Sequence, residues 1–160
     1  MASFTGQSEH KLDDKGRLFL PRRILDAVED PEERHRFILM AGPDPCVYLL
    51  TVSAFRERYR NLKRDLRGHQ DYVQVMRGLS RLLSEERLDG QGRLLIPPYL
   101  RDKAGLGRKV VVVGVFEMVE IWDAEAWNSD TMPAAEEAFH RHSGSFFNFG
   151  QSDDPDEGRP

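Results

Sequence analysis

The sequence predicts an α+β fold in which one unit of strands and a short helix occurs twice and the two copies share a core. Two observations carry this prediction: the chain repeats itself at a nearly constant spacing, and each copy alternates short apolar runs with turn residues, as strands do. A unit of roughly fifty residues buries too little apolar surface to be stable alone. The two copies are therefore expected to form an intrachain pseudo-dimer with connecting helices.

The repeat is clearest in two fourteen-residue segments. Residues 8–21 align without a gap with residues 84–97 at an offset of 76, and eight of the fourteen positions are identical. The similarity resumes at an offset of 72, where residues 42–55 match residues 114–127. Agreement over this length indicates a duplication. The segments expected from it are a first copy at residues 7–54, a helical connector at 55–82 and a second copy at 83–126.

Each copy begins with a strand and a tight turn. Polar and apolar residues alternate before Asp13 and Asp89, as they do in a half-buried strand. Gly16 and Gly92 stand where a three-residue hairpin loop needs a positive φ. The short apolar run that comes next, Leu18–Leu20 in the first copy, predicts a strand that is buried on both faces.

Proline ends this run in both copies and begins a short helix, because it cannot donate to a strand and its fixed φ suits the first helical turn. Two more strands follow in each copy. The expected elements are helices at Arg22–Val28 and Pro98–Ala104 and strands at Phe37–Ala41, Cys46–Thr51, Val110–Gly114 and Met118–Trp122. The connector is expected to hold two helices, one capped by Ser53 and one that begins at Asp71 with an apolar stripe.

The composition indicates a soluble cytoplasmic protein. Hydrophobic residues make up 39% and charged residues 31% of the chain, and no apolar run is long enough to cross a bilayer. The first residues lack the pattern of a signal peptide, and a single cysteine excludes an intrachain disulfide. From Ser143 onward, small polar residues give way to acidic residues and proline, which predicts a disordered tail at 143–160. The last nine residues carry −3 of the net charge of −4, so the body is nearly neutral.

The repeated Asp-x-x-Gly-Arg motif places charged groups in both turns. Asp13 and Arg17 lie four residues apart across the turn, as do Asp89 and Arg93, which predicts an ion pair in each copy. One interpretation is that these pairs only brace the loops. The other is that the arginines also bind DNA, because a guanidinium has five donors and one edge stays free for phosphate or a base.

Lys15, at the tip of the first loop, is predicted to contact DNA phosphate because it lies in a basic loop near Arg17 and Arg22. Gln91 replaces it in the second loop and keeps hydrogen-bonding capacity without the charge. The first copy is therefore expected to be the stronger DNA contact. The basic stretch Arg56–Arg67 is expected to be a solvated helix face, with subunit contact or weak attraction of DNA as the alternative.

No catalytic or metal-binding pattern emerges, so neither an enzyme nor a cofactor is expected. His140-x-His142 is a weak zinc pattern, and Cys46 lies in an apolar strand, where it is expected to pack rather than react. Asp13 and Asp89 are in principle an acid–base pair for a hydrolase. Their arginine neighbours, however, are expected to keep both carboxylates ionised.

The residues that carry these motifs resemble the MraZ family, over about residues 4–127. The matching segments are Phe4-x-Gly6, Leu12-Asp13-x-Lys15-Gly16-Arg17-Leu18-x-x-Pro21 and Leu88-Asp89-x-Gln91-Gly92-Arg93-x-x-Ile96-Pro97. Each copy is similar to the AbrB-like swapped-hairpin DNA-binding domain. Two features depart from the family: Thr5 stands where a basic residue is common, and the aromatic and acidic tail after Ser143 does not match.

The resemblance implies a bacterial, nucleoid-associated transcriptional regulator. Such proteins bind double-stranded DNA at short direct repeats upstream of the division and cell-wall gene cluster, and they assemble into rings, commonly of eight subunits. The DNA-contacting loops of the family correspond here to Lys15 and Arg17 of the first copy and to Gln91 and Arg93 of the second. The alternative function is a structural or protein-interaction oligomer that binds DNA only incidentally.

Overall fold

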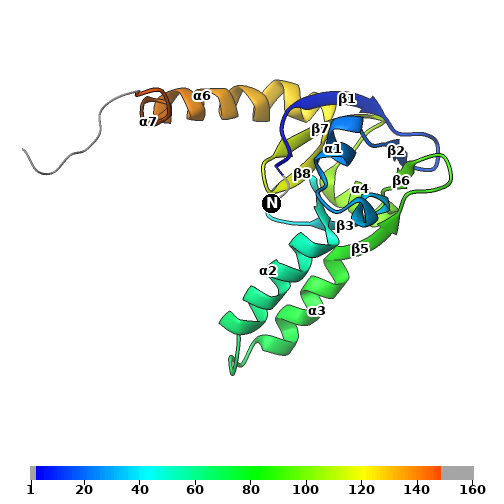
Figure 1. Ribbon diagram of the computed structural model, residues 1–160, viewed down its shortest axis with the longest axis vertical. Coiled ribbons are helices and arrows are strands. Elements are labelled where there is room, and N and C mark those ends of the chain that lie inside the picture. The colour runs from blue at the N-terminus through cyan, green and yellow to red at the C-terminus, as the bar shows by residue number, and fades with distance from the viewer. Residues whose placement is uncertain (1–2, 149–160) are drawn as a thin grey trace, which may run out of the picture. The chain divides into compact units, whose positions relative to one another are not determined.

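The computed structural model describes residues 3–148, which form an α+β structure (Figure 1). The chain divides into one compact unit that ends at Trp127 and a second that begins at Asn128. The strands are β1 (Gln7–Lys11), β2 (Arg17–Phe19), β3 (Arg36–Ala41), β4 (Val47–Thr51), β5 (Leu83–Arg87), β6 (Arg93–Leu95), β7 (Lys109–Val115) and β8 (Met118–Asp123). The helices are α1 (Arg22–Ala27), η1 (Pro31–His35), α2 (Val52–Asp65), α3 (Tyr72–Leu82), α4 (Pro98–Ala104), α5 (Ala124–Ala126), η2 (Trp127–Thr131), α6 (Met132–His142) and α7 (Gly144–Phe147).

Strand pairing exchanges elements between the two copies. The large sheet has the order β1-β7-β8-β4-β3-β5, so the first strand of each copy pairs with a strand of the other copy. β2 and β6 form a separate two-stranded ribbon in which Leu18 lies opposite Leu94. A two-fold rotation that exchanges the two copies leaves the strand order of the large sheet and that of the ribbon unchanged. The predicted pseudo-dimer of swapped hairpins is therefore confirmed.

The two copies differ by one residue in the hairpin formed by their last two strands. Ser8 pairs with Val112, whereas the equivalent Ser84 pairs with Leu39, so β3 and β7 correspond at an offset of 73 rather than 72. β4 and β8 keep the offset of 72. The shorter second connection contains Phe116 with a φ of 57°, a left-handed conformation that costs a non-glycine residue about 1–2 kcal/mol.

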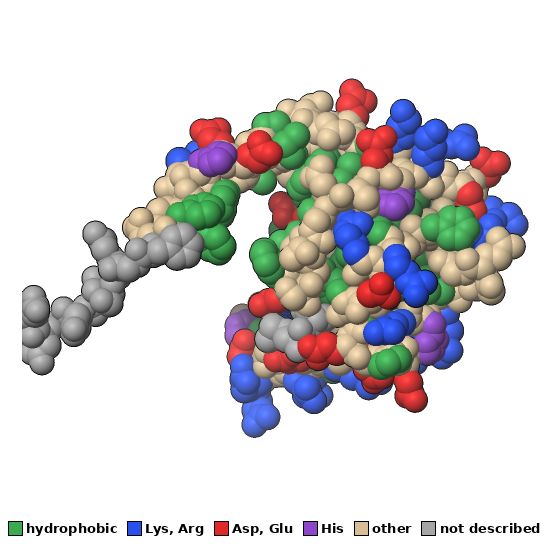
Figure 2. All heavy atoms as spheres, turned by 45° about the horizontal axis from the view of Figure 1, so that its top comes forward, with side chains coloured by type: hydrophobic (Ala, Val, Ile, Leu, Met, Phe, Trp, Pro, Cys, Tyr) green, Lys and Arg blue, Asp and Glu red, His purple; other side chains and the backbone are tan. Residues whose placement is uncertain are grey.

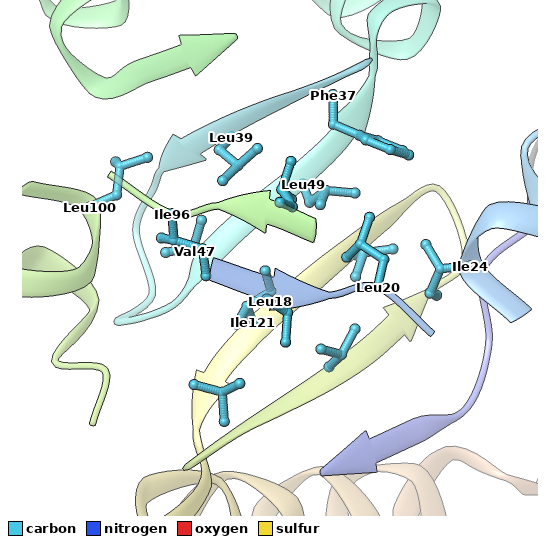
Figure 3. Packing of buried hydrophobic residues seen from close by; sticks show 14 of the residues in the cluster. Leu18, Leu20, Ile24, Phe37, Leu39, Val47, Leu49, Ile96, Leu100 and Ile121 are labelled. Carbon is cyan, nitrogen blue, oxygen red and sulfur yellow. The ribbon is translucent and has the colours of Figure 1, made fainter. Parts of the chain in front are cut away.

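The β2–β6 ribbon and helices α1 and α4 pack over the large sheet and close one core (Figure 3). Leu18 and Leu94 of the ribbon are completely buried, as are Ile24 of α1 and Leu100 of α4. The sheet residues of the same cluster include Phe37, Leu39, Val47, Leu49, Val110, Val112, Val119 and Ile121. Both copies supply residues to this cluster, so neither copy has a core of its own.

The ribbon is buried on one face only. Phe19 is 58% exposed and Leu95 is 36% exposed, because side chains alternate between the two faces of a strand and the outer face of the ribbon forms part of the surface. The prediction that Leu18–Leu20 is buried on both faces is wrong.

Helices α2 and α3 form a helical hairpin between β4 and β5 (Figure 1). α2 begins at Val52 because the hydroxyl of Thr51 accepts a hydrogen bond from the Ala54 N–H at 3.2 Å. Ser53 is not the N-cap that the sequence suggested. Its N–H and its hydroxyl instead donate to the carboxylate of Glu33 at 2.9 and 2.8 Å.

The second unit contains helices that the sequence analysis did not predict. α6 is followed by the short helix α7, although irregular chain was expected from Ser143 onward. Phe139, Phe146 and Phe147 meet edge to face, with ring centroids between 5.0 and 6.2 Å apart. The rest of the expected tail, residues 149–160, lies outside the described residues.

Candidate nucleic-acid interface

The carboxylate of Asp13 organises the first loop. Its Oδ1 accepts the backbone N–H groups of Lys15 and Arg17, both at 2.9 Å, and its Oδ2 accepts from Arg17 Nε at 2.7 Å. Gly16, with a φ of 81°, donates its N–H to the Asp13 carbonyl at 2.9 Å. Hydrogen bonds to an ionised acceptor are stronger than neutral ones, so a single side chain holds the loop in one conformation.

The second loop repeats this arrangement. Oδ1 of Asp89 accepts the N–H groups of Gln91 and Arg93 at 2.9 Å, and Oδ2 accepts from Arg93 Nε at 2.8 Å. An ion pair is therefore present in each copy. In the first loop the bracing uses only Nε of Arg17, and its two Nη nitrogens have no hydrogen-bond partner among the described residues.

The two motifs are neighbours in space although 76 residues separate them in the chain. Nη1 of Arg93 lies 3.7 Å from Oδ2 of Asp13, and the Ile96 N–H donates to the Gly16 carbonyl at 3.0 Å. Among the described residues, Arg93 thus contacts two carboxylates, that of Asp89 and that of Asp13, whereas Arg17 contacts one. The two loops therefore form a single surface at the pseudo-two-fold axis. On this surface the Arg17 side chain makes fewer interactions with protein carboxylates than the Arg93 side chain does.

Both motif aspartates are anionic at neutral pH. The hydrogen bond from the Arg17 backbone N–H, followed by those from the Arg17 side chain and the Lys15 N–H, lowers the pKa of Asp13 to about 2. The corresponding bonds from Arg93 and Gln91 lower the pKa of Asp89. A carboxylate that stays ionised is an acceptor only, which argues against a general-acid role for either aspartate.

Asp13→Asn is expected to destabilise the protein at neutral pH and to lose this effect in acid. The pKa of Asp13 in the folded protein, about 2, lies below its ordinary value of 3.8. The ionised carboxylate therefore stabilises the folded state above the ordinary pKa, and this contribution disappears as the pH falls toward 2. The measurement is the free energy of unfolding of both proteins as a function of pH. Asp14→Asn is the control, because Asp14 is exposed and makes none of the loop hydrogen bonds; a gap for Asp13→Asn that stays constant into acid would contradict this account.

Beside each loop, two positively charged residues lie opposite each other on neighbouring strands. Lys11 lies directly opposite Lys109 where β1 pairs with β7, and Arg36 lies opposite Arg87 at the matching place in the other copy. Arg36 is partly neutralised by Glu85 at 3.3 Å. Like charges opposite each other on neighbouring strands destabilise a sheet, so a bound anion would relieve this repulsion.

The structure adds two arginines to the first loop that sequence spacing did not indicate. Arg101 of α4 lies against Gly16, where any larger side chain would meet its guanidinium. Arg108, which precedes β7, lines a pocket of about 340 Å³ together with Arg101, Asp13 and Asp14. No such contact exists at Gly92, around which the space is open. The first loop is therefore the more cationic of the two.

The two arginines of α1 have different surroundings. Arg22, whose side chain is 87% exposed, donates to Asp26 at 3.3 Å and makes no contact with either loop among the described interactions. Arg23 is half-buried, and its partial burial lowers its pKa. Its three acceptors are the Thr5 carbonyl, the Ser8 hydroxyl and the Val112 carbonyl. Arg23 fixes the N-terminal segment to the sheet through all three of its nitrogens.

The remaining reactive group of interest is the single cysteine. Burial raises the pKa of the Cys46 thiol to about 12, so it is neutral and packed. Within residues 3–148, no three side chains of the metal-binding types come together. No helix in that range has the length and apolar character needed to cross a membrane.

Several known proteins that are similar to this chain carry the same name. The family model described as "MraZ protein, putative antitoxin-like" matches residues 84–147, a range that extends through α6 into α7. "Transcriptional regulator MraZ" of Cutibacterium acnes is 35% identical over 136 residues, which are 85% of this chain and 92% of that protein. The protein of the same name from Paenarthrobacter aurescens is 34% identical over 128 residues, 78% of this chain and 84% of that one.

A third relative, "Transcriptional regulator MraZ" of Dehalococcoides mccartyi, is 34% identical over 137 residues, which are 85% of this chain and 93% of that protein. Identity at this level extends over most of both chains in each comparison. The chain is therefore a member of the MraZ family of transcriptional regulators.

Proposed function

We propose that this protein regulates transcription by binding duplex DNA through its two Asp-x-x-x-Arg loops. The proposed target is a set of short direct repeats upstream of the division and cell-wall gene cluster, reached in the nucleoid by a ring-shaped homo-oligomer, an octamer. The observation that carries the proposal is the convergence of exposed cations on two loops that their own aspartates hold rigid.

The first loop offers groups for both kinds of DNA contact. Lys15 at its tip and the Lys11–Lys109 pair beside it are point charges suited to phosphate. The two Nη nitrogens of Arg17 have no hydrogen-bond partner within residues 3–148, and guanidinium nitrogens are the donors that read a guanine edge in the major groove. Because Asp13 already fixes the loop backbone, little conformational entropy is lost when DNA binds.

The second loop is proposed to contribute less. Gln91 replaces the lysine, and Arg93 is shared between two carboxylates. Arg22 is proposed as an outlying phosphate contact, since its guanidinium is exposed and its ion pair with Asp26 is at the surface. Exposed ion pairs of this kind are worth at most about 1 kcal/mol and exchange readily for a phosphate.

An oligomer accounts for DNA binding by a protein of net charge −4. One cationic loop binds weakly, but several loops at regular spacing engage repeated DNA boxes together, and each contact after the first is effectively intramolecular. Self-association is supported by an apolar groove of about 270 Å³ on the first unit. Its lining includes Met40, Tyr48, Leu50, Phe55, Leu62 and Met118. Exposed apolar surface of this kind is typical of subunit contacts.

The test is a gel-shift assay of the full chain with the region upstream of its own gene. The protein is expected to prefer this fragment to a shuffled duplex of the same length, and its affinity is expected to fall steeply with salt. Light scattering should show a single closed oligomer. Equal binding of the two duplexes at moderate salt would refute sequence-specific regulation and favour a structural or protein-interaction oligomer.

A further inference from the structure

The α2–α3 hairpin carries a concentration of positive charge that the loops do not use. Residues 52–82 contain eight arginines and lysines against three acidic residues, a net charge of +5 in a chain whose total is −4. Figure 1 shows the hairpin extending away from the strands of the first unit, and Figure 2 shows Lys and Arg side chains at the lower edge of the view, with Asp and Glu side chains among them. The rest of the chain is correspondingly acidic, so the hairpin is a separate electrostatic feature.

The cations converge on a pocket at the turn between the two helices, which we call the hairpin-tip pocket. Its volume is about 490 Å³, and its lining consists of Arg60, Lys63, Arg64, Arg67, Gly68 and Tyr72. No carboxylate lines it. Arg64 has a long ion pair with Asp65 at 3.5 Å, whereas Arg60 and Arg67 have no ion pair among the described residues.

The arrangement within the pocket is repulsive. Arg60 and Arg64 lie four residues apart on α2, and like charges at this spacing destabilise a helix. Lys63 and Arg67 add two more cations to the same pocket, Lys63 from the last turn of α2 and Arg67 from the turn that follows it. The helix dipole accounts for cations in the last turn, such as Lys63 and Arg64. It does not account for Arg60, one turn earlier, or for Arg67, which lies beyond the helix. A polyanion would turn these repulsions into attractions.

We propose that the hairpin-tip pocket binds the phosphodiester backbone of duplex DNA as a second, sequence-independent contact. Guanidinium groups match phosphate oxygens in pairs, and Lys63, whose Nζ lies 5.5 Å from the centre of the Tyr59 ring, adds a point charge. Backbone contacts carry no sequence information. The inference rests on the proposed function, because the loops select the site and the hairpin adds affinity on either side of it.

The test compares two double variants that remove the same charge from the same hairpin. Arg60→Gln with Arg67→Gln changes the pocket, whereas Arg77→Gln with Arg81→Gln changes exposed positions of α3 that do not line it. The affinity of each full chain for a shuffled duplex is measured over a range of salt. The pocket variant is expected to lose about two units of salt slope, one for each phosphate contact, and roughly tenfold in affinity at low salt. The α3 variant should stay close to wild type.

The outcomes separate this inference from the proposed function. The pocket variant is expected to keep its preference for the upstream fragment over the shuffled duplex, since the loops supply that preference. Equal losses in the two variants would overturn the inference, as would dissociation of the oligomer by the pocket variant alone. Weaker binding of poly-glutamate with unchanged DNA binding would overturn it too, in favour of an acidic protein partner. Absence of any fragment preference in wild type would instead count against the proposed function.

Discussion

Arg17→Ala is expected to abolish the preference of the protein for its upstream DNA while the oligomer remains intact. Its two Nη nitrogens have no partner among the described residues, and a bidentate arginine–base contact is worth about 1–3 kcal/mol of discrimination. The same contact is lost in every subunit that touches DNA, so the overall affinity should fall by at least about a hundredfold. Gel shift measures the preference, and light scattering measures the oligomer.

Arg93→Ala provides the matched comparison, because it removes the same side chain from the other copy. Arg93 contacts both Asp89 and Asp13, so its loss should lower the free energy of unfolding more than Arg17→Ala does and should weaken DNA binding less. Equal losses of DNA binding would show that the two copies contribute equally. Loss of the oligomer in Arg17→Ala would show that Arg17 is chiefly structural.

Leu18→Ala is expected to lower the free energy of unfolding by about 2–5 kcal/mol. Leu18 is completely buried beside the pseudo-two-fold axis, opposite Leu94, where both copies pack against it and the surrounding side chains cannot easily fill the cavity. Domains of this size have a total stability of roughly 5–15 kcal/mol, so the variant should unfold at a much lower urea concentration.

Phe19→Ala is the control for this change, since it removes a larger side chain from the next position of the same strand. Phe19 is 58% exposed, and surface substitutions usually change stability by no more than about 0.5 kcal/mol. Urea unfolding of the two variants should therefore differ clearly. A cost for Phe19→Ala equal to that for Leu18→Ala would mean that the outer face of the ribbon is covered in the assembled protein.

The sequence predicts those features that depend on near neighbours in the chain. Asp13, Gly16 and Arg17 contact one another within a single turn, so residue types and spacing suffice to predict the loop and its ion pair. The repeat likewise predicts one core for two copies, because neither copy is large enough alone. The N-cap of α2 lies only two residues from the predicted one, because Thr51 and Ser53 are both residue types that cap helices. Ser53 bonds to Glu33, which is distant in the sequence, and Thr51 caps the helix instead.

Features that depend on pairing between the copies are beyond such reasoning. Lys109 lies beside the first loop only because β1 pairs with β7 in one particular register. Arg101 reaches Gly16 from α4. The sequence hints at a special role for Arg101 only in that the equivalent position of the first copy is an apolar residue, Leu25. The exposure of Phe19 depends on whether a third layer covers the ribbon, which periodicity along one strand does not reveal.

The exchange of strands between the copies also determines when folding can be completed. Gln7 pairs with Val113, so β1 finds its partner only after most of the second copy has been synthesised. Until then the nascent chain carries open strand edges and an incomplete apolar cluster, the features that make intermediates prone to aggregation. Closing such distant pairings is slow. A chain cut at Gly68 is therefore expected to yield two halves that are insoluble apart and fold only when they are mixed.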